Sequence, residues 1–443
     1  MKRSCIACTA LGMLLAVCCA AAAQPGPTQE ELDQAQRSTE WLLPNHDYAG
    51  VRYVDLKQIT PVNAGSLRPV CMYQGADLNR ALNNPIVYAG VMYVTTLHAT
   101  VALDPGTCKV KWRHEWKPKA KEGNASIKNR GVAIKAGKLV RGTQDGYLFA
   151  LDAATGKMLW EVKAADSEKF EALSINPLIY DDLVIIGPSG SEFGIKGWIG
   201  AFRLDDGRPV WKFNTIPDDG EPGAETWGAA DSRLKGGGGI WTTPALDIAK
   251  GHLYVAVGNP APDIFAGQRP GANLYTNSVV VLDVRTGKLL WHKQAVPHDS
   301  HDWDMPVTSP LFGATLSGKE RNVATMAAKD GLLRLIDRDS QEQIYSVASQ
   351  GAKERVKVAF LLQKIAEKED IKVSQQEIAQ RITQLAATYQ IPADKFLKDL
   401  QKRNGLIEIY DQVMNEKVLD FLQQHAQIED VPPGSEIPGS NPS

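Results

Sequence analysis

The amino-acid sequence predicts an all-β propeller of about five four-stranded blades, followed by a small all-α domain. Two observations favour this division. An aromatic-ended motif recurs five times before residue 346, and beyond residue 351 the apolar period changes from two to 3.6. The distribution of tryptophan changes near the same boundary, because nine of the ten tryptophans lie between Trp112 and Trp303. The chain therefore combines two architectures.

Each repeat contains an apolar pair, an aspartate, a turn and a strand that ends in an aromatic residue. The segments are VALDPGTCKVKW to Trp112, FALDAATGKMLW to Trp160, AFRLDDGRPVW to Trp211, VVLDVRTGKLLW to Trp291 and the degraded RLIDRDSQEQIY to Tyr345. The first intervals are roughly 50 residues, a period typical of propellers or solenoids. Further alternating runs between the repeats favour four strands per blade. We expect the tryptophans to pack one blade on the next and the aspartates to be turn residues.

The N-terminus has the pattern of a secretory signal peptide over residues 1–23. Lys2 and Arg3 supply positive charge, residues 6–17 form a short apolar run, and residues 20–23 are small. The run is shorter than a membrane span, and no other segment has transmembrane length. The sequence thus predicts a periplasmic or secreted protein, with a lipoprotein site at Cys18 as the alternative. The net charge of −2 gives no electrostatic footprint for nucleic acid.

Cys71 and Cys108 are the cysteines that remain after cleavage of the signal peptide. Two cysteines in a secreted domain favour a disulfide over free thiols. The turn at Pro105–Gly106 precedes Cys108 and could fold it back onto the entry strand. We therefore expect a Cys71–Cys108 disulfide in the first blade.

Segments that interrupt the repeat indicate the chemistry. They are NRG (129–131), GTQDG (142–146), SGSEFG (189–194), GGGGIW (236–241), VGN (257–259) and PHDSHDWD (297–304). In this order, over residues 35–347, they resemble the pyrroloquinoline-quinone (PQQ) dependent alcohol dehydrogenases of the methanol and ethanol type. That family closes eight blades, so the resemblance implies an incomplete eight-bladed-type propeller over residues 24–347.

The resemblance implies a site for PQQ, a flat quinone with three carboxylates. Trp241 matches the aromatic plate beneath the ring, and Arg130 and Lys329 match cations for its carboxylate and quinone oxygens. Hydroxyl donors are implied at Thr143, Ser174 and Ser189.

The resemblance also implies a metal ion and a catalytic base. Glu192 and Asn259 match ligands of a calcium ion, and Asp302 matches both a ligand and the base that takes the alcohol proton. Asp304 lies at the spacing associated with lanthanide use, so the ion is calcium or a lanthanide. A small alcohol is the implied substrate, and a separate cytochrome c is the implied electron acceptor, since the sequence has no CxxCH motif.

Simpler interpretations exist for several of these residues. Arg130 suits a surface charge, Trp241 a core residue, and Glu192 a solvated turn. Asp302 is harder to dismiss, because residues 298–304 contain three carboxylates and two imidazoles within seven residues.

Residues 351–431 predict four helices. Ser374 and Glu377 form a capping box for the second helix, Pro392 opens the third, and the fourth covers about residues 406–425. This stretch resembles the C-terminal chaperone region of bacterial trigger factor, which implies binding of unfolded polypeptide. The junction at residues 346–351 has no linker, which indicates a fusion of two genes or a chimeric sequence. Residues 432–443 are expected to be disordered.

Three functions compete at this point. The first is PQQ-dependent alcohol oxidation, impaired because five blades leave the cofactor site open. The second is polypeptide binding by the helical tail, and the third is a non-enzymatic propeller scaffold. We expect an open arc of blades, with the helices apart from it or loosely against its edge.

Overall fold

The computed structural model describes residues 26–75, 82–121, 128–228, 230–305, 309–348, 350–389, 391–402 and 405–426. The signal peptide expected at residues 1–23, the end of the expected helical domain at residues 427–431 and the tail expected at residues 432–443 lie outside these ranges. Among the described residues, no helix is both long and apolar enough to cross a membrane.

Five four-stranded antiparallel sheets form the first part of the chain, and each contains four strands consecutive in the sequence. The first sheet contains β1 (Ile86–Tyr88), β2 (Val91–Thr95), β3 (Ala99–Leu103) and β4 (Val110–Glu115). The second contains β5 (Ala133–Lys135), β6 (Lys138–Gly142), β7 (Tyr147–Asp152) and β8 (Met158–Lys163). The third is β9 (Leu178–Tyr180), β10 (Leu183–Ile186), β11 (Trp198–Arg203) and β12 (Pro209–Asn214). The fourth contains β13 (Ala245–Asp247), β14 (His252–Val257), β15 (Ser278–Asp283) and β16 (Leu289–Gln294). The fifth contains β17 (Leu311–Leu316), β18 (Lys319–Ala327), β19 (Leu332–Asp337) and β20 (Gln343–Ala348).

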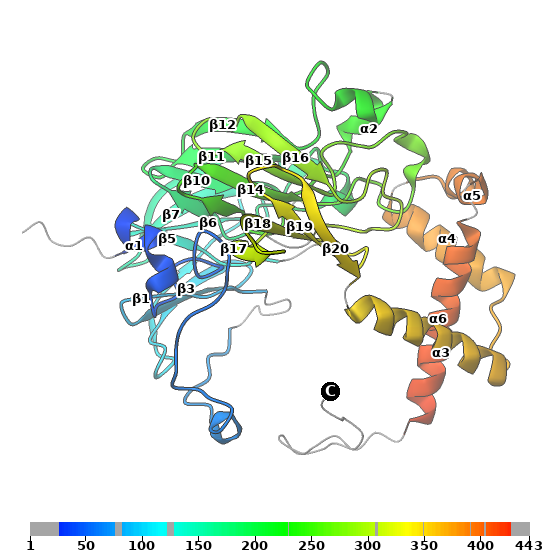
Figure 1. Cartoon of the computed structure of the whole chain (residues 1–443), viewed down its shortest axis with the longest axis horizontal. Helices are drawn as coiled ribbons and strands as arrows, with labels where there is room; N and C mark the ends of the chain where they lie inside the picture. Colours follow the sequence, from blue (N-terminus) through cyan, green and yellow to red (C-terminus); the bar gives the residue numbers. More distant parts are fainter. Residues whose placement is uncertain are drawn as a thin grey trace, which may run out of the picture.

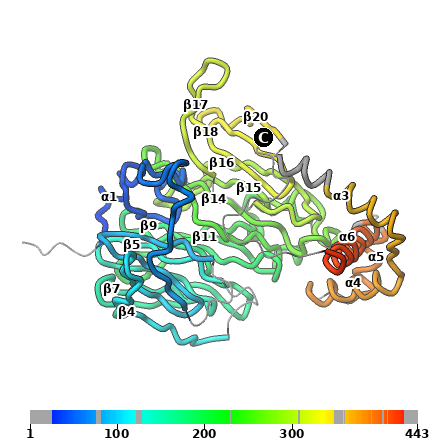
Figure 2. The backbone as a smooth tube through the Cα atoms, turned by 90° about the horizontal axis from the view of Figure 1, so that it is seen from below, coloured from blue at the N-terminus to red at the C-terminus, as the bar shows by residue number. Residues whose placement is uncertain are grey.

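The sheets follow one another round an arc in chain order, from cyan through green to yellow (Figure 2). The predicted fold class is confirmed, since the repeats correspond to five propeller-like blades followed by helices. The second and third strands of each sheet carry most of the buried residues, whereas β4 on the outer edge of its sheet is largely exposed.

The repeat tryptophans join neighbouring blades, as predicted. Three of them donate an indole hydrogen bond of 2.9–3.1 Å to a backbone oxygen of the next sheet: Trp112 to Ala153, Trp160 to Leu204 and Trp211 to Val284. The turn glycine of the next repeat lies under the same indole. At Gly156 a Cβ would stand 2.5 Å from the Trp112 ring, and φ is +70°. Glycine is required there for its positive φ and for its lack of a side chain.

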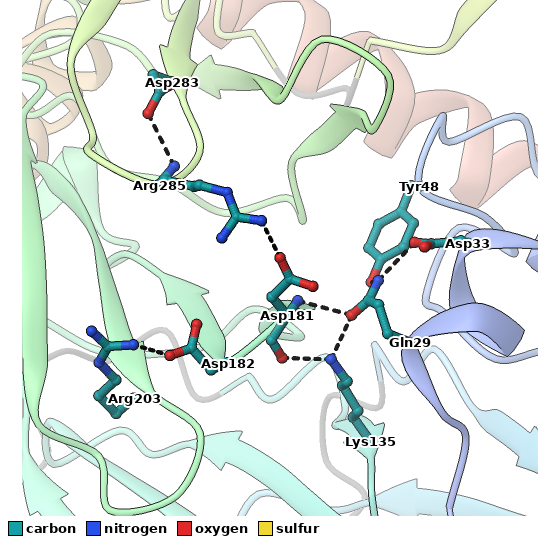
Figure 3. A network of polar contacts seen from close by, with 9 residues as sticks. All are labelled: Gln29, Asp33, Tyr48, Lys135, Asp181, Asp182, Arg203, Asp283 and Arg285. Carbon is teal, nitrogen blue, oxygen red and sulfur yellow. Dashed lines mark hydrogen bonds and ion pairs between the residues drawn. The ribbon is translucent and has the colours of Figure 1, made fainter.

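The segment before β1, which includes α1 (Gln29–Asp33), connects to several blades (Figure 3). Tyr48 donates a 2.6 Å hydrogen bond to the backbone oxygen of Ile179, and burial raises the pKa of its phenol. Gln29 accepts a 2.8 Å bond from the backbone of Asp181, and Lys135 donates to the Asp181 backbone oxygen at 2.5 Å. This segment therefore holds the second and third sheets together. In the same part of the chain, Cys71 and Cys108 form a disulfide with a Cα–Cα distance of 5.6 Å.

Four helices follow the last sheet: α3 (Gln350–Lys368), α4 (Gln375–Thr388), α5 (Ala393–Lys402) and α6 (Leu406–His425). The capping box predicted at Ser374 is present, with Glu377 as its partner. Strand β20 ends only two residues before α3 begins, so the change of architecture falls where the period of the sequence changes.

The helical tail is docked more tightly than the sequence suggests. It lies to one side of the sheets (Figure 1). Phe265, on the loop after β14, is only 2% exposed and belongs to the apolar core of the tail. Its ring centre lies 5.6 Å from that of Phe396 on α5, and Ile382 on α4 belongs to the same core. The expectation of loosely placed helices is therefore wrong, because an apolar propeller side chain enters the tail.

Candidate functional site

Three carboxylates gather where the connecting loops of the third, fourth and fifth sheets meet. Oxygens of Glu192, Asp302 and Asp304 all lie within 4.8 Å of one another. Glu192 belongs to the short helical turn Ser191–Phe193, flanked by glycines with φ of +114° and +71°. The two aspartates lie on the loop between β16 and β17. Three carboxylates this close repel one another unless a cation lies between them.

Asn259, on the loop after β14, contacts this group through its backbone. Its side chain is fully buried, and its Oδ1 has no hydrogen-bond partner. Its backbone N–H donates to Asp304 Oδ1 at 3.0 Å, which holds that carboxylate in place. A buried amide oxygen without a partner is costly, and a hard cation accepts oxygen donors of this kind.

Lys329, after β18, is the cation nearest to the two aspartates. Its Nζ lies 2.9 Å from Asp302 Oδ2 and 3.5 Å from Asp304 Oδ2. The second oxygen of Asp302, Oδ1, is buried and has no hydrogen-bond partner. Lys329 therefore fixes one oxygen of Asp302, and the other is buried without a partner.

Burial and the neighbouring lysine act in opposite directions on the pKa values of the two aspartates. Burial raises the pKa of Asp304 to about 6, although Lys329 and Trp241 act to lower it. Burial likewise raises the pKa of Asp302, against the effect of Lys329. Burial alone would lower the pKa of Lys329, but Asp302, Asp304 and Glu192 raise it overall. One lysine thus does not balance the negative charge of the cluster.

A cavity of about 170 Å³ opens beside the cluster. Six of its lining residues belong to the set predicted from the sequence: Arg130, Ser189, Glu192, Trp241, Asp304 and Lys329. Lys128 also lines it and was not predicted, although it lies only two residues before Arg130. The cavity thus places a tryptophan and three cationic side chains beside the carboxylates.

Arg130 connects the tryptophan to the serines. Its guanidinium lies 5.5 Å from the centre of the Trp241 ring, and Nη1 donates to Ser174 Oγ at 2.9 Å. Ser174 Oγ in turn donates to Ser189 Oγ at 2.7 Å. Burial lowers the pKa of Arg130 while Glu192 raises it. The predicted residues therefore form a chain of contacts from the aromatic ring to the hydroxyls.

Thr143 is not brought into this cavity. Its hydroxyl accepts a 2.9 Å hydrogen bond from the backbone of Tyr147 and donates to the backbone oxygen of the same residue. The side chain is therefore used in the turn between β6 and β7.

Asp299 was not assigned a role from the sequence. It is 1% exposed and accepts hydrogen bonds from the backbones of His301 at 2.9 Å and Trp303 at 2.8 Å. Asn277, immediately before β15, donates to it at 2.9 Å. Asp299 therefore shapes the loop that presents Asp302, and the only sequence signal was the density of carboxylates in that loop.

Comparisons with known proteins agree with this geometry. The model of the "glucose/ethanol/alcohol dehydrogenase, beta-propeller domain" family, labelled PQQ, matches residues 41–358. The model of the bacterial trigger factor C-terminus matches residues 321–424. The two ranges overlap over residues 321–358, which hold most of β18, β19, β20 and the start of α3. The structure places the three strands in the fifth sheet, so the helical match begins in effect at α3.

Individual relatives are similar over the same part of the chain. Quinohemoprotein alcohol dehydrogenase ADH IIB of Pseudomonas putida is 35% identical over 328 residues, covering 70% of this chain and 47% of its own length. The 1-butanol dehydrogenase (cytochrome c) of Thauera butanivorans is 36% identical over 322 residues, covering 68% and 46%. A europium-containing methanol dehydrogenase superposes with a TM-score of 0.68 at 30% identity, covering 72% of this chain and 60% of that one. The chain thus spans about half the length of the curated relatives it matches.

Proposed function

Because the chain belongs to the family of the glucose/ethanol/alcohol dehydrogenase β-propeller domain, we propose that it binds PQQ with a calcium or lanthanide ion and oxidises a small alcohol. The observation that carries this proposal is the convergence of Glu192, Asp302 and Asp304. Asn259 adds a fourth oxygen donor with no partner of its own.

The residues present fit both groups. Four hard oxygen donors suit calcium, and the third carboxylate suits an ion of higher charge. Trp241 offers a flat surface, while Arg130 and Lys329 offer cations for the carboxylates of PQQ. When bound, PQQ supplies the hydride-accepting quinone, and the metal ion supplies a Lewis acid.

Asp302 is the residue we assign as general base. Its Oδ1, which is buried and has no partner, would accept the hydroxyl proton of the alcohol, while Lys329 holds Oδ2 and fixes the direction of the carboxylate. A base must be ionised, and burial raises the pKa of Asp302. Activity should therefore rise with pH as this carboxyl loses its proton.

We further propose that turnover is weak. The family closes eight blades around the cofactor, whereas five sheets occur among the described residues. An open site admits water, which weakens metal binding and polarisation of the carbonyl. The electron acceptor is a separate cytochrome c, and the protein acts in the periplasm or as a secreted protein.

Dye-linked alcohol oxidation by the full chain, given PQQ with calcium or lanthanum, tests the proposal. We expect turnover that requires PQQ and metal, lies well below that of a complete homologue, and falls at least about a hundredfold in Asp302→Asn. Asp205→Asn, on the exposed turn between β11 and β12, is the matched control. Binding of neither PQQ nor metal would overturn the assignment and favour the scaffold alternative.

Polypeptide binding by the tail is a second candidate, because the tail exposes large apolar side chains. Phe360 and Leu361 on α3 are 62% and 59% exposed. A cleft of about 720 Å³ lies between α3 and α6, with Phe360, Tyr410 and Met414 among its lining residues. Exposed apolar surface of this kind is typical of interaction sites. Binding of reduced, carboxymethylated α-lactalbumin that is lost in Phe360→Ser would support this function, and equal binding by both proteins would refute it.

A further inference from the structure

The docked tail forms one wall of a second cavity, which meets the carboxylate cluster at Glu192. Its volume is about 390 Å³, within the range of small-molecule sites. The propeller contributes Glu192 and Phe193, and the tail contributes Tyr389, Ile391, Pro392 and Lys395. Glu192 lines both this cavity and the smaller one beside Trp241. The two spaces therefore adjoin at a predicted metal ligand.

Both walls of the second cavity are anchored. The propeller loop that contributes to it carries Phe265, which is buried against Phe396 in the tail. Tyr389 lies at the end of α4, 6.1 Å from the Phe396 ring, and its side chain interacts with buried Asp263 on the same propeller loop. Apolar packing and a polar contact thus hold the tail wall in position beside the cluster.

Part of the lining suits the carbon chain of a substrate. Phe193, Leu234, Ile391 and Pro392 provide apolar surface, whereas charged side chains also line the cavity, namely Glu192, Asp231, Lys235, Arg269 and Lys395. In the proposed function PQQ would occupy the smaller cavity, so the carbon chain of the alcohol needs other space. Each methylene buried on apolar surface contributes about a fourfold gain in affinity.

Resting on the proposed alcohol oxidation, we propose that this cavity binds the carbon chain of the substrate and that the helical tail makes the enzyme selective for longer alcohols. Ile391 and Pro392 are the specificity-determining residues of the tail. A domain that resembles a chaperone fragment therefore serves as a wall of the substrate pocket.

Binding of a tertiary alcohol tests this without turnover, because a tertiary alcohol has no hydrogen on its carbinol carbon to transfer. Calorimetry compares 2-methyl-2-heptanol with tert-butanol on the full chain, on Ile391→Trp and on Ile407→Trp. Ile407 is 65% exposed on α6 and does not line the cavity. We expect the long alcohol to bind the unaltered chain at least about tenfold more tightly than tert-butanol, to lose about tenfold in Ile391→Trp, and to be unchanged in Ile407→Trp. No binding to the unaltered chain, or equal affinity in all three proteins, would overturn the proposal.

A second pair of variants keeps the test valid if Ile391→Trp does not fold. Lys395→Trp places an indole at the cavity from an exposed position on α5, and Lys398→Trp is its control on the same helix, outside the cavity lining. We expect the loss only in Lys395→Trp, and equal binding by the pair would contradict the proposal.

Failure of this inference differs from failure of the proposed function. If ethanol is oxidised with PQQ and metal but the long tertiary alcohol does not bind, only the assignment of the cavity is wrong. If the long alcohol binds as expected but neither PQQ nor metal does, the cavity stands as an alcohol site and the oxidation is wrong.

Discussion

The blades and the helical tail bury different kinds of residue. Among the described residues, every charged side chain that is buried lies in the propeller part or the segments around it, including Arg141, Arg269 and Asp304. The buried side chains described in the tail, such as Leu362, Phe396 and Val418, are apolar. Buried charges require partners or ligands, whereas an apolar core requires only packing. The comparison indicates that the chemistry belongs to the blades and that the tail contributes shape and apolar surface.

The two parts also differ in how their centres are assembled. Glu192 and Asp302 are 110 residues apart in the sequence and meet only because three blades pack in order. Within the tail, α4 contacts α5 and α6, and α3 contacts α6, so the helices that pack together all lie within residues 350–425. The site therefore depends on packing between distant blades, whereas the tail core depends on helices of one short segment together with Phe265.

The largest effect on stability should come from the shared apolar core. Phe396→Ala removes a fully buried ring that contacts both Phe265 and Tyr389, and we expect a loss of about 3–5 kcal/mol in the free energy of unfolding of the tail. Urea unfolding followed by helical circular dichroism measures this loss. Phe360→Ala, at a side chain that is 62% exposed, should change the value by less than about 0.5 kcal/mol. Equal losses in the two variants would contradict the burial of Phe396 in the apolar core that the tail shares with Phe265.

A glycine pair tests the contact between blades. Gly156→Ala and Gly90→Ala both introduce a Cβ at φ +70°, but only the first meets a ring, that of Trp112 at 2.5 Å. The backbone cost is common to both, so Gly156→Ala should destabilise the protein by about 1–3 kcal/mol more. Thermal unfolding of the two variants gives this difference directly. If Gly90→Ala were the more damaging change, the indole contact would not hold the blades together.

The smallest effect on stability concerns Asp304. Its pKa is raised by burial to about 6, so the ionised carboxylate destabilises the metal-free fold above that pH. Stability from this group should rise as the pH falls from about 6 toward 4, because the folded state then binds the extra proton. Asp304→Asn should accordingly stabilise the metal-free protein by about 1–2 kcal/mol at pH 7.5 and by less at pH 4.5. Urea midpoints at the two pH values test the sign, and destabilisation at pH 7.5 would contradict it.

The features repeated along the chain were predictable, and those that join distant segments were less so. The tryptophan repeat gave the five sheets, and Ser374 with Glu377 gave the start of α4, because both patterns are local. The three carboxylates were predicted from the motifs that contain them, and not from any expectation of how they lie in space. The docking of Phe265 had no sequence signal, because a single phenylalanine in a loop does not indicate which core it enters. Asp299 was missed since its role depends on backbone atoms that a sequence does not place.

In the proposed function, the loops that carry Glu192, Asp302 and Asp304 form a metal site. Titration of the full chain with terbium, followed by luminescence sensitised through the aromatic residues, tests it most directly. We predict one saturable site that weakens at least about a hundredfold in the double variant Asp302→Asn/Asp304→Asn, because two of its charged ligands are removed. Asp205→Asn/Asp206→Asn, on the turn between β11 and β12, should leave the affinity unchanged. No saturable site, or equal affinity in the two double variants, would contradict a metal site at these residues.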